Sequence, residues 1–443
     1  MRSIGLDVGS RVAEVAIVEP GRAARSGGRI SASPEGLSTF AASLGPDDQV
    51  VLEATTNTWA IVELLERHAG RVVVSNPLRT RAIADAKTKT DTIDAATLAE
   101  LLAADYLPTV WQPGAATRAL RRRVAARAAL VGERSRLRNR VSAVLVRNLA
   151  RCPWSDTFGV HGRRWLAGLA LPVDERELVD QTLRLLDVLE SEIRAADAAL
   201  ATIVLDDAGV RRLLTIPGIG LGSAAALVAL IGDVTRFPRP NKLVGYLGLD
   251  PIVRQSGGRA AHTGHISHAG AGHVRALLVE AAQAAIRVPG PLHAFHARLA
   301  ARRGFSIATV AVARKLAVLA WHLLSHATEY RWAPPRLTAK KVRALELAAG
   351  APRRHGQRGS GESRSARAAA RGIERAALVQ VEQAYVAFVE ARAKDAAATK
   401  RGATREARAE ARQGSAAEPD PRHSALRHGV DRVRPNDTRD PTA

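Results

Sequence analysis

Cysteine is almost absent from this chain, and its absence excludes two kinds of site. The single cysteine, Cys152, can form neither a disulfide framework nor a cysteine-based zinc site within one chain. Aromatic residues are also sparse, at 4% of 443 residues. The opening residues, MRSIGLDVGS, run directly into a strand pattern and lack the layout of a signal peptide.

Long apolar runs are missing as well. A helix that spans a bilayer needs about 20 consecutive apolar residues. The stretch over residues 311–324 is interrupted by Arg314 and Lys315, so we do not expect it to span a membrane. These absences together predict a soluble, cytoplasmic protein.

Positive charge, by contrast, is plentiful. The chain has 65 Lys and Arg against 43 Asp and Glu, a formal net charge of +22. Such an excess predicts a polyanionic partner, although ribosomal, membrane-surface and nucleic-acid-acting proteins all share it. With 46% hydrophobic residues over this length, two or more domains with buried cores are expected.

The first part of the chain, residues 1–110, has the pattern of an α/β domain. Short β-rich runs alternate with helical stretches. The runs are at 4–8, 12–18, 50–54 and 72–74, and the clearest helices are at 59–68 and 91–104.

Residues 111–205 are predicted to be a helical, coiled-coil region. One heptad track is formed by Val179, Leu186, Ile193 and Leu200. A second track consists of Thr182, Leu189, Ala196 and Ile203. The arginine-rich helix 118–148 is a candidate antiparallel partner, with 153–172 at the tip. A hairpin within one chain and a contact between two chains explain the tracks equally well.

Residues 206–335 are predicted to form a mostly helical second domain. Beyond it, residues 336–443 are rich in Arg, Ala, Gly and Ser, so a basic, largely disordered tail is expected. Leu378, Val381, Tyr385 and Phe388 have helical spacing and predict one amphipathic helix at 373–394 within it.

Four carboxylates in the first domain are candidate metal ligands. Asp7 ends the first strand in GLDVG, Glu53 ends a later strand in VVLEAT, and Asp91 and Asp94 open a helix in KTDTIDA. The spacing of the last two places both on one helix face. Mg²⁺ prefers oxygen ligands, and two such ions can activate an attacking oxygen and stabilise a leaving one. Singly, each residue has an ordinary explanation, such as Asp91 as a helix N-cap.

These strings and their order resemble the RuvC-like, RNase H-like nuclease domain of the DEDD insertion-sequence transposases, the IS110 family. The resemblance implies that Asp7, Glu53, Asp91 and Asp94 bind Mg²⁺ or Mn²⁺ and are catalytic. GLDVGS is also typical of actin-like and sugar-kinase ATPases. That class should have a second Asp-Gly phosphate turn and a glycine-rich adenosine loop, and neither is found in a suitable strand context.

The second domain contains two further motifs. LLTIPGIGLGSAAALVALIGD has the pattern of a helix-hairpin-helix, in which Gly218 and Gly220 would let backbone amides contact a nucleic acid phosphate. Further along, Ser256 lies in QSGG between Arg254 and Arg259, which could neutralise a phosphate. A serine needs a base or a metal to become a nucleophile, so a plain loop serine is the ordinary interpretation.

The order PGIG, GYLGLDP, SGG, ISHAG and HVRALL resembles the C-terminal transposase domain of the same family. The resemblance implies that Ser256 is the nucleophile that joins covalently to a DNA end; Ser267 ranks lower. It also implies DNA as substrate and a structured guide RNA as a partner. A composite site between subunits would make the protein a dimer or tetramer.

The sequence therefore predicts a transposase, a site-specific DNA recombinase that moves an insertion sequence. One alternative is a RuvC-like Holliday-junction resolvase or nuclease that uses metal-activated water, with Ser256 only a phosphate ligand. Another is a nucleic-acid-binding protein without enzymatic activity, which would not need Asp7 or Asp91.

Overall fold

The first of the two units into which the chain divides, Met1–Arg122, is built on a mixed five-stranded sheet. The computed structural model describes residues 1–84, 90–257, 261–353 and 364–414, with side chains in the last segment for 365, 366 and 368–395. The second unit is Arg123–Ala443.

The sheet has the strand order β3-β2-β1-β4-β5. Its strands are β1 (Ser3–Val8), β2 (Val12–Val18), β3 (Arg25–Ser31), β4 (Gln49–Glu53) and β5 (Arg71–Ser75). The first three strands pair antiparallel, whereas β1, β4 and β5 run parallel. Parallel strands buried on both faces have nearly continuous apolar sequences, as β4 and β5 do here. This mixed sheet with helices is consistent with the predicted RNase H-like fold.

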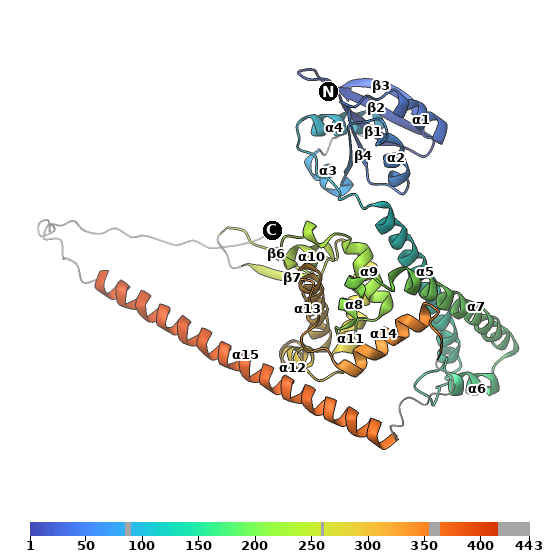
Figure 1. Ribbon diagram of the computed structural model, residues 1–443, viewed down its shortest axis with the longest axis vertical. Helices are drawn as coiled ribbons and strands as arrows, with labels where there is room; N and C mark the ends of the chain where they lie inside the picture. The colour runs from blue at the N-terminus through green and yellow to red at the C-terminus, as the bar shows by residue number, and fades with distance from the viewer. Residues whose placement is uncertain (85–89, 258–260, 354–363, 415–443) are drawn as a thin grey trace, which may run out of the picture. The chain divides into compact units, whose positions relative to one another are not determined.

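Helices cover both faces of the sheet (Figure 1). On one face, α1 (Pro34–Ala42) and α2 (Thr58–Leu65) pack on a core that includes Leu6, Val15 and Leu52. On the other face, α4 (Asp91–Ala103) packs on Ala16, Val51 and neighbouring residues. A short helix, α3 (Pro77–Ile83), follows β5.

The edge strand β3 was not predicted from the sequence. Its residues, RSGGRIS, lack the apolar alternation that identified the other strands, and nearly all are exposed. Only the antiparallel ladder with β2 defines it, with an irregularity opposite Val15 and Ala16. An edge strand of this kind is held by backbone pairing rather than by side-chain burial.

The second unit begins with a helical hairpin. Its long helices are α5 (Ala115–Arg147), which starts in the first unit, and α7 (Val173–Val204), with α6 (Val160–Gly168) between them. Cross-helix pairs run in opposite sequence directions, as in an antiparallel arrangement: Arg127 with Asp197, Arg138 with Glu190 at 3.1 Å and Arg147 with Glu175 at 2.8 Å.

The first predicted heptad track of α7 is buried within the chain. Val179, Leu186, Ile193 and Leu200 are at most 6% exposed, whereas Ile203 of the second track is 48% exposed. These residues pack inside one chain, so they favour the hairpin interpretation over a contact between two chains.

The rest of the second unit is mostly helical. Its elements are α8 (Ala208–Leu214), α9 (Leu221–Ile231), η1 (Val234–Arg236), α10 (Pro240–Tyr246), β6 (Pro251–Arg254), β7 (His262–Ile266), α11 (Gly272–Ala285), α12 (Pro291–Arg303) and α13 (Phe305–Ser325). By length and composition α13 could cross a membrane. However, Val312, Leu316 and Ala320 are fully buried, as expected for the core helix of a folded domain.

Two further helices follow in the segment predicted as a tail. In α14 (Pro335–Ala348), Lys341 Nζ donates to the carbonyls of Leu214 (2.9 Å) and Ile216 (2.6 Å), which ties this helix to the end of α8. The last helix, α15 (Arg364–Gly414), extends the predicted 373–394 helix at both ends. Its Glu382 accepts from the backbone N–H of Gly290 at 2.7 Å. The sequence pattern alone did not reveal these anchors, because they are polar.

Candidate active site

Asp7 and Glu53 lie at the same edge of the sheet. In the parallel ladder between β1 and β4, Leu6 is opposite Leu52, so Asp7 and Glu53 are each one residue further along. Neighbouring strands lie about 4.8 Å apart. Both side chains are half-buried. The carboxyl ends of two adjacent parallel strands thus bring these acids next to one another.

Helix α4 brings the aspartate pair toward the same face. Gly5 lies two residues before Asp7, and a Cβ at Gly5 would be 2.1 Å from the carbonyl oxygen of Ala95. Only glycine allows this close packing. Ala95 directly follows Asp94, which is half-buried, whereas Asp91 is exposed. Since residues two apart in a strand share a face, Asp7 is on the face that α4 covers.

Asp91 is not the N-cap of α4, so that alternative is wrong. Thr90 is the N-cap, because its side chain accepts a hydrogen bond from Ile93 N at 3.3 Å. Asp91 and Asp94 occupy the first turn, where negative charge is favoured by the helix dipole.

The donor set suits a hard divalent cation. Asp7, Glu53, Asp91 and Asp94 offer only carboxylate oxygens, the ligands that Mg²⁺ and Mn²⁺ prefer. Among the described residues, no three His, Cys, Asp or Glu side chains are close enough to hold a metal ion together. Asp7 and Glu53 lie at adjacent strand ends and α4 packs beside Gly5 through Ala95, next to Asp94. The metal-binding role of the four acids stays a prediction.

A fifth acid, which the sequence motifs did not indicate, lies beside Asp7. Glu14 in β2 is directly opposite Asp7 and is only 6% exposed. Arg29 of β3, the next strand, is opposite Glu14 and donates to it through Nε. The sequence carried a signal, because the predicted strands 4–8 and 12–18 are joined by a short connection that contains glycine, as in a hairpin. In the structure Gly9 N donates to Val12 O at 3.0 Å, and the hairpin pairs residue 7 with residue 14.

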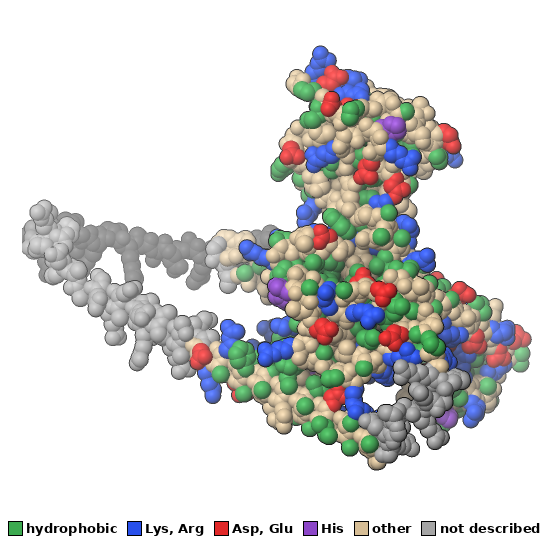
Figure 2. Space-filling model, in the orientation of Figure 1, with side chains coloured by type: hydrophobic (Ala, Val, Ile, Leu, Met, Phe, Trp, Pro, Cys, Tyr) green, Lys and Arg blue, Asp and Glu red, His purple; other side chains and the backbone are tan. Residues whose placement is uncertain are grey.

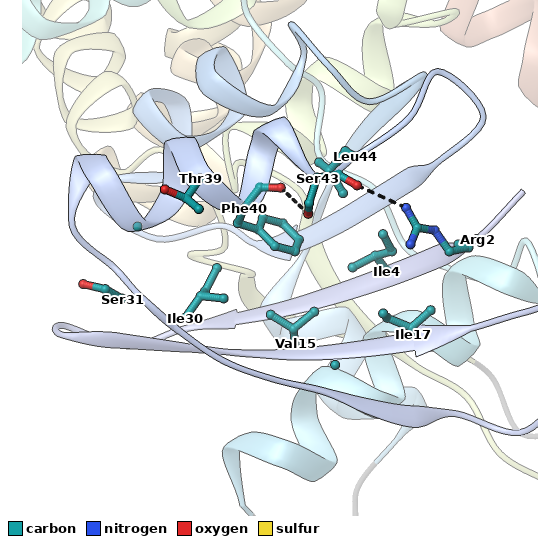
Figure 3. Close-up of a pocket in the computed structure, with 12 residues that line it drawn as sticks. Arg2, Ile4, Val15, Ile17, Ile30, Ser31, Thr39, Phe40, Ser43 and Leu44 are labelled. Atoms are coloured by element: carbon teal, nitrogen blue, oxygen red, sulfur yellow. Dashed lines mark hydrogen bonds between the residues drawn. The ribbon is translucent and has the colours of Figure 1, made fainter.

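A recess of about 480 Å³ lies on the opposite side of the sheet (Figure 3). It is lined by Ile4, Val15 and Ile30 below and by Phe40 of α1 above. Its lining is mixed, because Arg2, Thr39 and Ser43 also contribute to it. Ile4 and Val15 alternate along their strands with Gly5 and Glu14, so the recess faces away from the acids.

Ser256 lies between β6 and β7, two residues after the end of β6. These strands form a separate two-stranded antiparallel ribbon in which Arg254 pairs with His262. Ser256 and Arg254 are both exposed, and Gly257 has a positive φ of 57°. Arg259 lies outside the described residues. The hydroxyl of Ser256 is therefore presented to solvent, as a nucleophile for a large substrate must be.

The base of this ribbon joins two of the sequence motifs. A Cβ at Gly248 of GYLGLDP, which has φ +65°, would be 2.0 Å from the carbonyl oxygen of Ala269 in ISHAG. Ser267 N donates to Asp250 O at 2.8 Å, and Ser267 Oγ donates to Asp250 Oδ1 at 2.7 Å. Ser267 therefore serves as a structural link between the two motifs, and its lower rank as a nucleophile stays a prediction.

The predicted hairpin is formed by α8, a tight turn and α9. Gly218 has φ +84° within the turn, and Gly220 is the N-cap of α9, where its N–H donates to Ser223 Oγ at 3.0 Å. A recess of about 260 Å³ beside the turn is lined by Gly218, Ser223 and Arg127, among other residues. A glycine turn, a helix N-terminus and an arginine together could accept a phosphate. The contact itself stays a prediction.

Basic side chains occur in both units, and α5 is especially rich in arginine. On the face shown in Figure 2, Lys and Arg are interspersed with Asp and Glu. Charge alone therefore does not mark a binding surface on this face.

Comparison with known proteins identifies the family to which this chain belongs. Residues 4–148 match the DEDD transposase domain of IS110 elements, and residues 210–297 match the domain described as "Transposase IS116/IS110/IS902 family". Together these segments cover just over half of the chain. The chain belongs to the IS116/IS110/IS902 family of transposases, with a DEDD N-terminal domain and the family's C-terminal domain.

Individual relatives agree with this assignment. The chain is 35% identical to a "Probable family 20 transposase" of Pseudomonas aeruginosa, over 37% of this chain and 49% of that protein. It is 30% identical to the transposase for insertion sequence element IS1111A of Coxiella burnetii, over 35% and 45%. The corresponding values for the IS1328 transposase of Yersinia enterocolitica are 29%, 46% and 62%. The matched segments thus span about half of these relatives.

Proposed function

We propose that this protein moves an insertion sequence by cutting and rejoining DNA strands through a covalent serine–DNA intermediate. The observation that carries the proposal is the placement of Asp7 and Glu53 at adjacent strand ends. The helix that carries Asp94 packs on the same face. The match of both domains to one transposase family supports it.

In this proposal, Ser256 Oγ attacks a backbone phosphate. The bond from Oγ to phosphorus forms, the bond to the 3′ oxygen breaks, and the 3′ oxygen leaves as a hydroxyl after taking up a proton. Ser256 loses its own proton and remains as a phosphoserine ester of the 5′ end. Rejoining is the reverse reaction with a different 3′ hydroxyl.

The four acids would hold Mg²⁺ or Mn²⁺, which, when bound, stabilises the charge that develops on the phosphate oxygens. Arg254, beside the exposed serine, would contact the attacked phosphate. The serine has no His–Asp relay in its sequence neighbourhood. We therefore propose that it attacks DNA only when the DNA and the acids, from the same or a neighbouring subunit, are assembled around it.

A discriminating experiment compares Ser256→Ala with Ser267→Ala on DNA that carries the element ends. Denaturing electrophoresis should show a protein–DNA adduct with the wild type and with Ser267→Ala, and none with Ser256→Ala. A resolvase that uses water should cleave without any adduct, and Ser256→Ala should keep most of its activity. That result would refute the serine mechanism while leaving a metal nuclease in place.

We further propose that a structured RNA from the element guides the choice of DNA, as the family resemblance implies. The net charge of +22 supports a polyanionic partner but does not separate RNA from DNA. Sequencing the RNA that co-purifies with the protein tests this. A discrete segment from the element is expected, and a random collection of cellular RNAs would contradict it.

A further inference from the structure

The four candidate metal ligands, Asp7, Glu53, Asp91 and Asp94, are called the acid group below. The buried acid Glu14 and its partner Arg29 lie next to Asp7 of this group. Across the sheet, Arg29 of β3, Glu14 of β2 and Asp7 of β1 are opposite one another in consecutive strands. Residues directly opposite in an antiparallel pair project from the same face of the sheet. All three side chains therefore belong to the face on which α4 packs.

Glu14 holds the guanidinium of Arg29 close to the acids. The Nε of Arg29 donates to Glu14 Oε1. Glu14 is fixed because its side chain is 8% exposed, whereas that of Arg29 is 74% exposed. Since Arg29 reaches back to Glu14, its charged group lies over β2, about one strand spacing of 4.8 Å from the strand of Asp7.

An arginine in this position has a use in binding DNA. A row of carboxylates repels the phosphates that it must act on, and a cation at its end offsets that repulsion. The guanidinium has five N–H donors in a planar fork that matches phosphate oxygens, and the contact with Glu14 uses Nε. Because the side chain of Arg29 is mostly exposed, its remaining donors are accessible to a phosphate.

We propose that Arg29, positioned by Glu14, binds the DNA phosphate adjacent to the one on which the acids act. The proposal rests on the proposed function, because it takes Asp7 and Glu53 to be catalytic. These two acids form one end of the row of residues that crosses the sheet, and Arg29 forms the other end. Arg29 would set the register of the strand, and Glu14 would be a positioning residue that acts through it.

The test measures DNA binding by the full-length protein at several NaCl concentrations. The probe is a fluorescent duplex of arbitrary sequence, with Ca²⁺ in place of Mg²⁺. Losing one phosphate contact should reduce the slope of log K against log salt by about 0.9, which weakens binding about eightfold at 0.1 M salt. Arg29→Ala should show this loss, and Arg29→Lys should recover part of the slope.

Arg25→Ala is the matched control. Arg25 lies at the other end of the same strand, is 54% exposed and is paired with Glu19. The substitution removes the same charge but should leave the slope nearly unchanged. An equal loss with Arg25→Ala would show that only overall charge matters and would overturn the proposal.

Glu14→Gln gives the sharpest contrast. It adds one positive charge to the protein, so simple attraction predicts tighter DNA binding. If Glu14 positions Arg29, binding should instead weaken by several-fold, with a smaller salt slope. Tighter DNA binding by Glu14→Gln would refute the inference. So would an unchanged salt slope with Arg29→Ala, or a loss with Arg29→Ala that is seen on an RNA duplex and not on DNA.

A parallel measurement separates this inference from the proposed function. Mn²⁺ should raise the melting temperature of the wild type and of Arg29→Ala, but not of Asp7→Asn, because ligand binding stabilises the folded state. If Asp7→Asn keeps the full Mn²⁺ response, the proposed function fails. If Arg29→Ala loses the response, Arg29 supports the acid group itself and the phosphate role is wrong.

Discussion

The acid group and the serine are held in very different ways. Asp7 and Glu53 extend from strands whose residues Leu6 and Leu52 are fully buried, and a helix packs on them through Gly5. Ser256 lies at the end of a two-stranded ribbon in which Ile252, Val253 and the serine itself are exposed. The acids are fixed by a core, whereas the described residues around the serine are exposed.

This difference matches the needs of the two proposed chemistries. Metal ligands must be placed accurately, and a rigid scaffold does this best. A nucleophile that joins to DNA must instead be accessible to a large substrate. We therefore expect substitutions near the acids to act through geometry, and substitutions in the ribbon to act through contacts made only when DNA is bound.

The largest expected effect is on the acids. Asp94→Asn should lower strand cleavage by more than about 100-fold, since loss of residues that merely support a metal ligand already costs 10- to 100-fold. The initial rate on DNA with the element ends measures this. The same replacement at exposed Asp105, outside the acid group, should have little effect. Activity near the wild-type level in Asp94→Asn would refute a catalytic role for this acid.

The close packing at Gly5 gives the next largest effect. Gly5→Ala should destabilise the protein by about 3 kcal/mol, because the new Cβ meets the backbone of α4. It should also weaken the Mn²⁺-induced rise in melting temperature. Gly114→Ala is the control, since a Cβ there has no neighbour within 4 Å. Equal stability of the two variants in urea would contradict the packing that places Asp94 near Asp7.

The next effect concerns Lys341 of α14, which holds the end of α8 in the α8–α9 hairpin. Lys341→Met leaves the carbonyls of Leu214 and Ile216 without this donor and should cost about 2 kcal/mol. Burial lowers the pKa of Lys341 to about 8 from 10.5. Between these values the unfolded chain binds more protons than the folded one, so stability rises with pH in this window.

Urea unfolding of the wild type and Lys341→Met at pH 7.5, 8.5 and 9.5 checks this sign. The stability difference in favour of the wild type should grow as the pH rises. A difference that stays constant or shrinks would show that the ammonium is not buried against the two carbonyls.

The smallest effect is expected at Asp48 in the first unit. Arg2 donates hydrogen bonds to Asp48, and this contact lowers the pKa of the carboxyl below 3.8. The ion pair therefore adds stability above pH 3.8, and that stability is lost as the pH falls through the lower folded-state pKa. Asp48→Asn should cost about 1 kcal/mol at pH 7. If the wild type and the variant differ equally at pH 7 and pH 3, the pair contributes nothing through its charge.

The sequence revealed the parts that are governed by local patterns. The strands that carry Asp7 and Glu53, the helix that begins at Asp91 and the buried track of α7 all follow from apolar periodicity. The exposed strand β3 has no such pattern, so Arg29 and its pairing with Glu14 were missed. Lys341 was missed because its partners are backbone carbonyls more than 100 residues earlier, which no local pattern indicates.

The ribbon shows a different limit. The sequence identified Ser256 through its motif and predicted a mostly helical domain, but not the two strands around it. Both strands are short and largely exposed, and one antiparallel ladder defines them. Sequence patterns thus predict buried helices and strands better than exposed ones.

The most direct test of the account is anomalous diffraction from crystals of the protein grown with Mn²⁺. We predict a peak about 2.0–2.3 Å from carboxylate oxygens of Asp7 and Glu53, with Asp94 in the same coordination shell. No peak at that edge of the sheet, or a peak bound by other residues, would contradict the claim that these acids hold the metal.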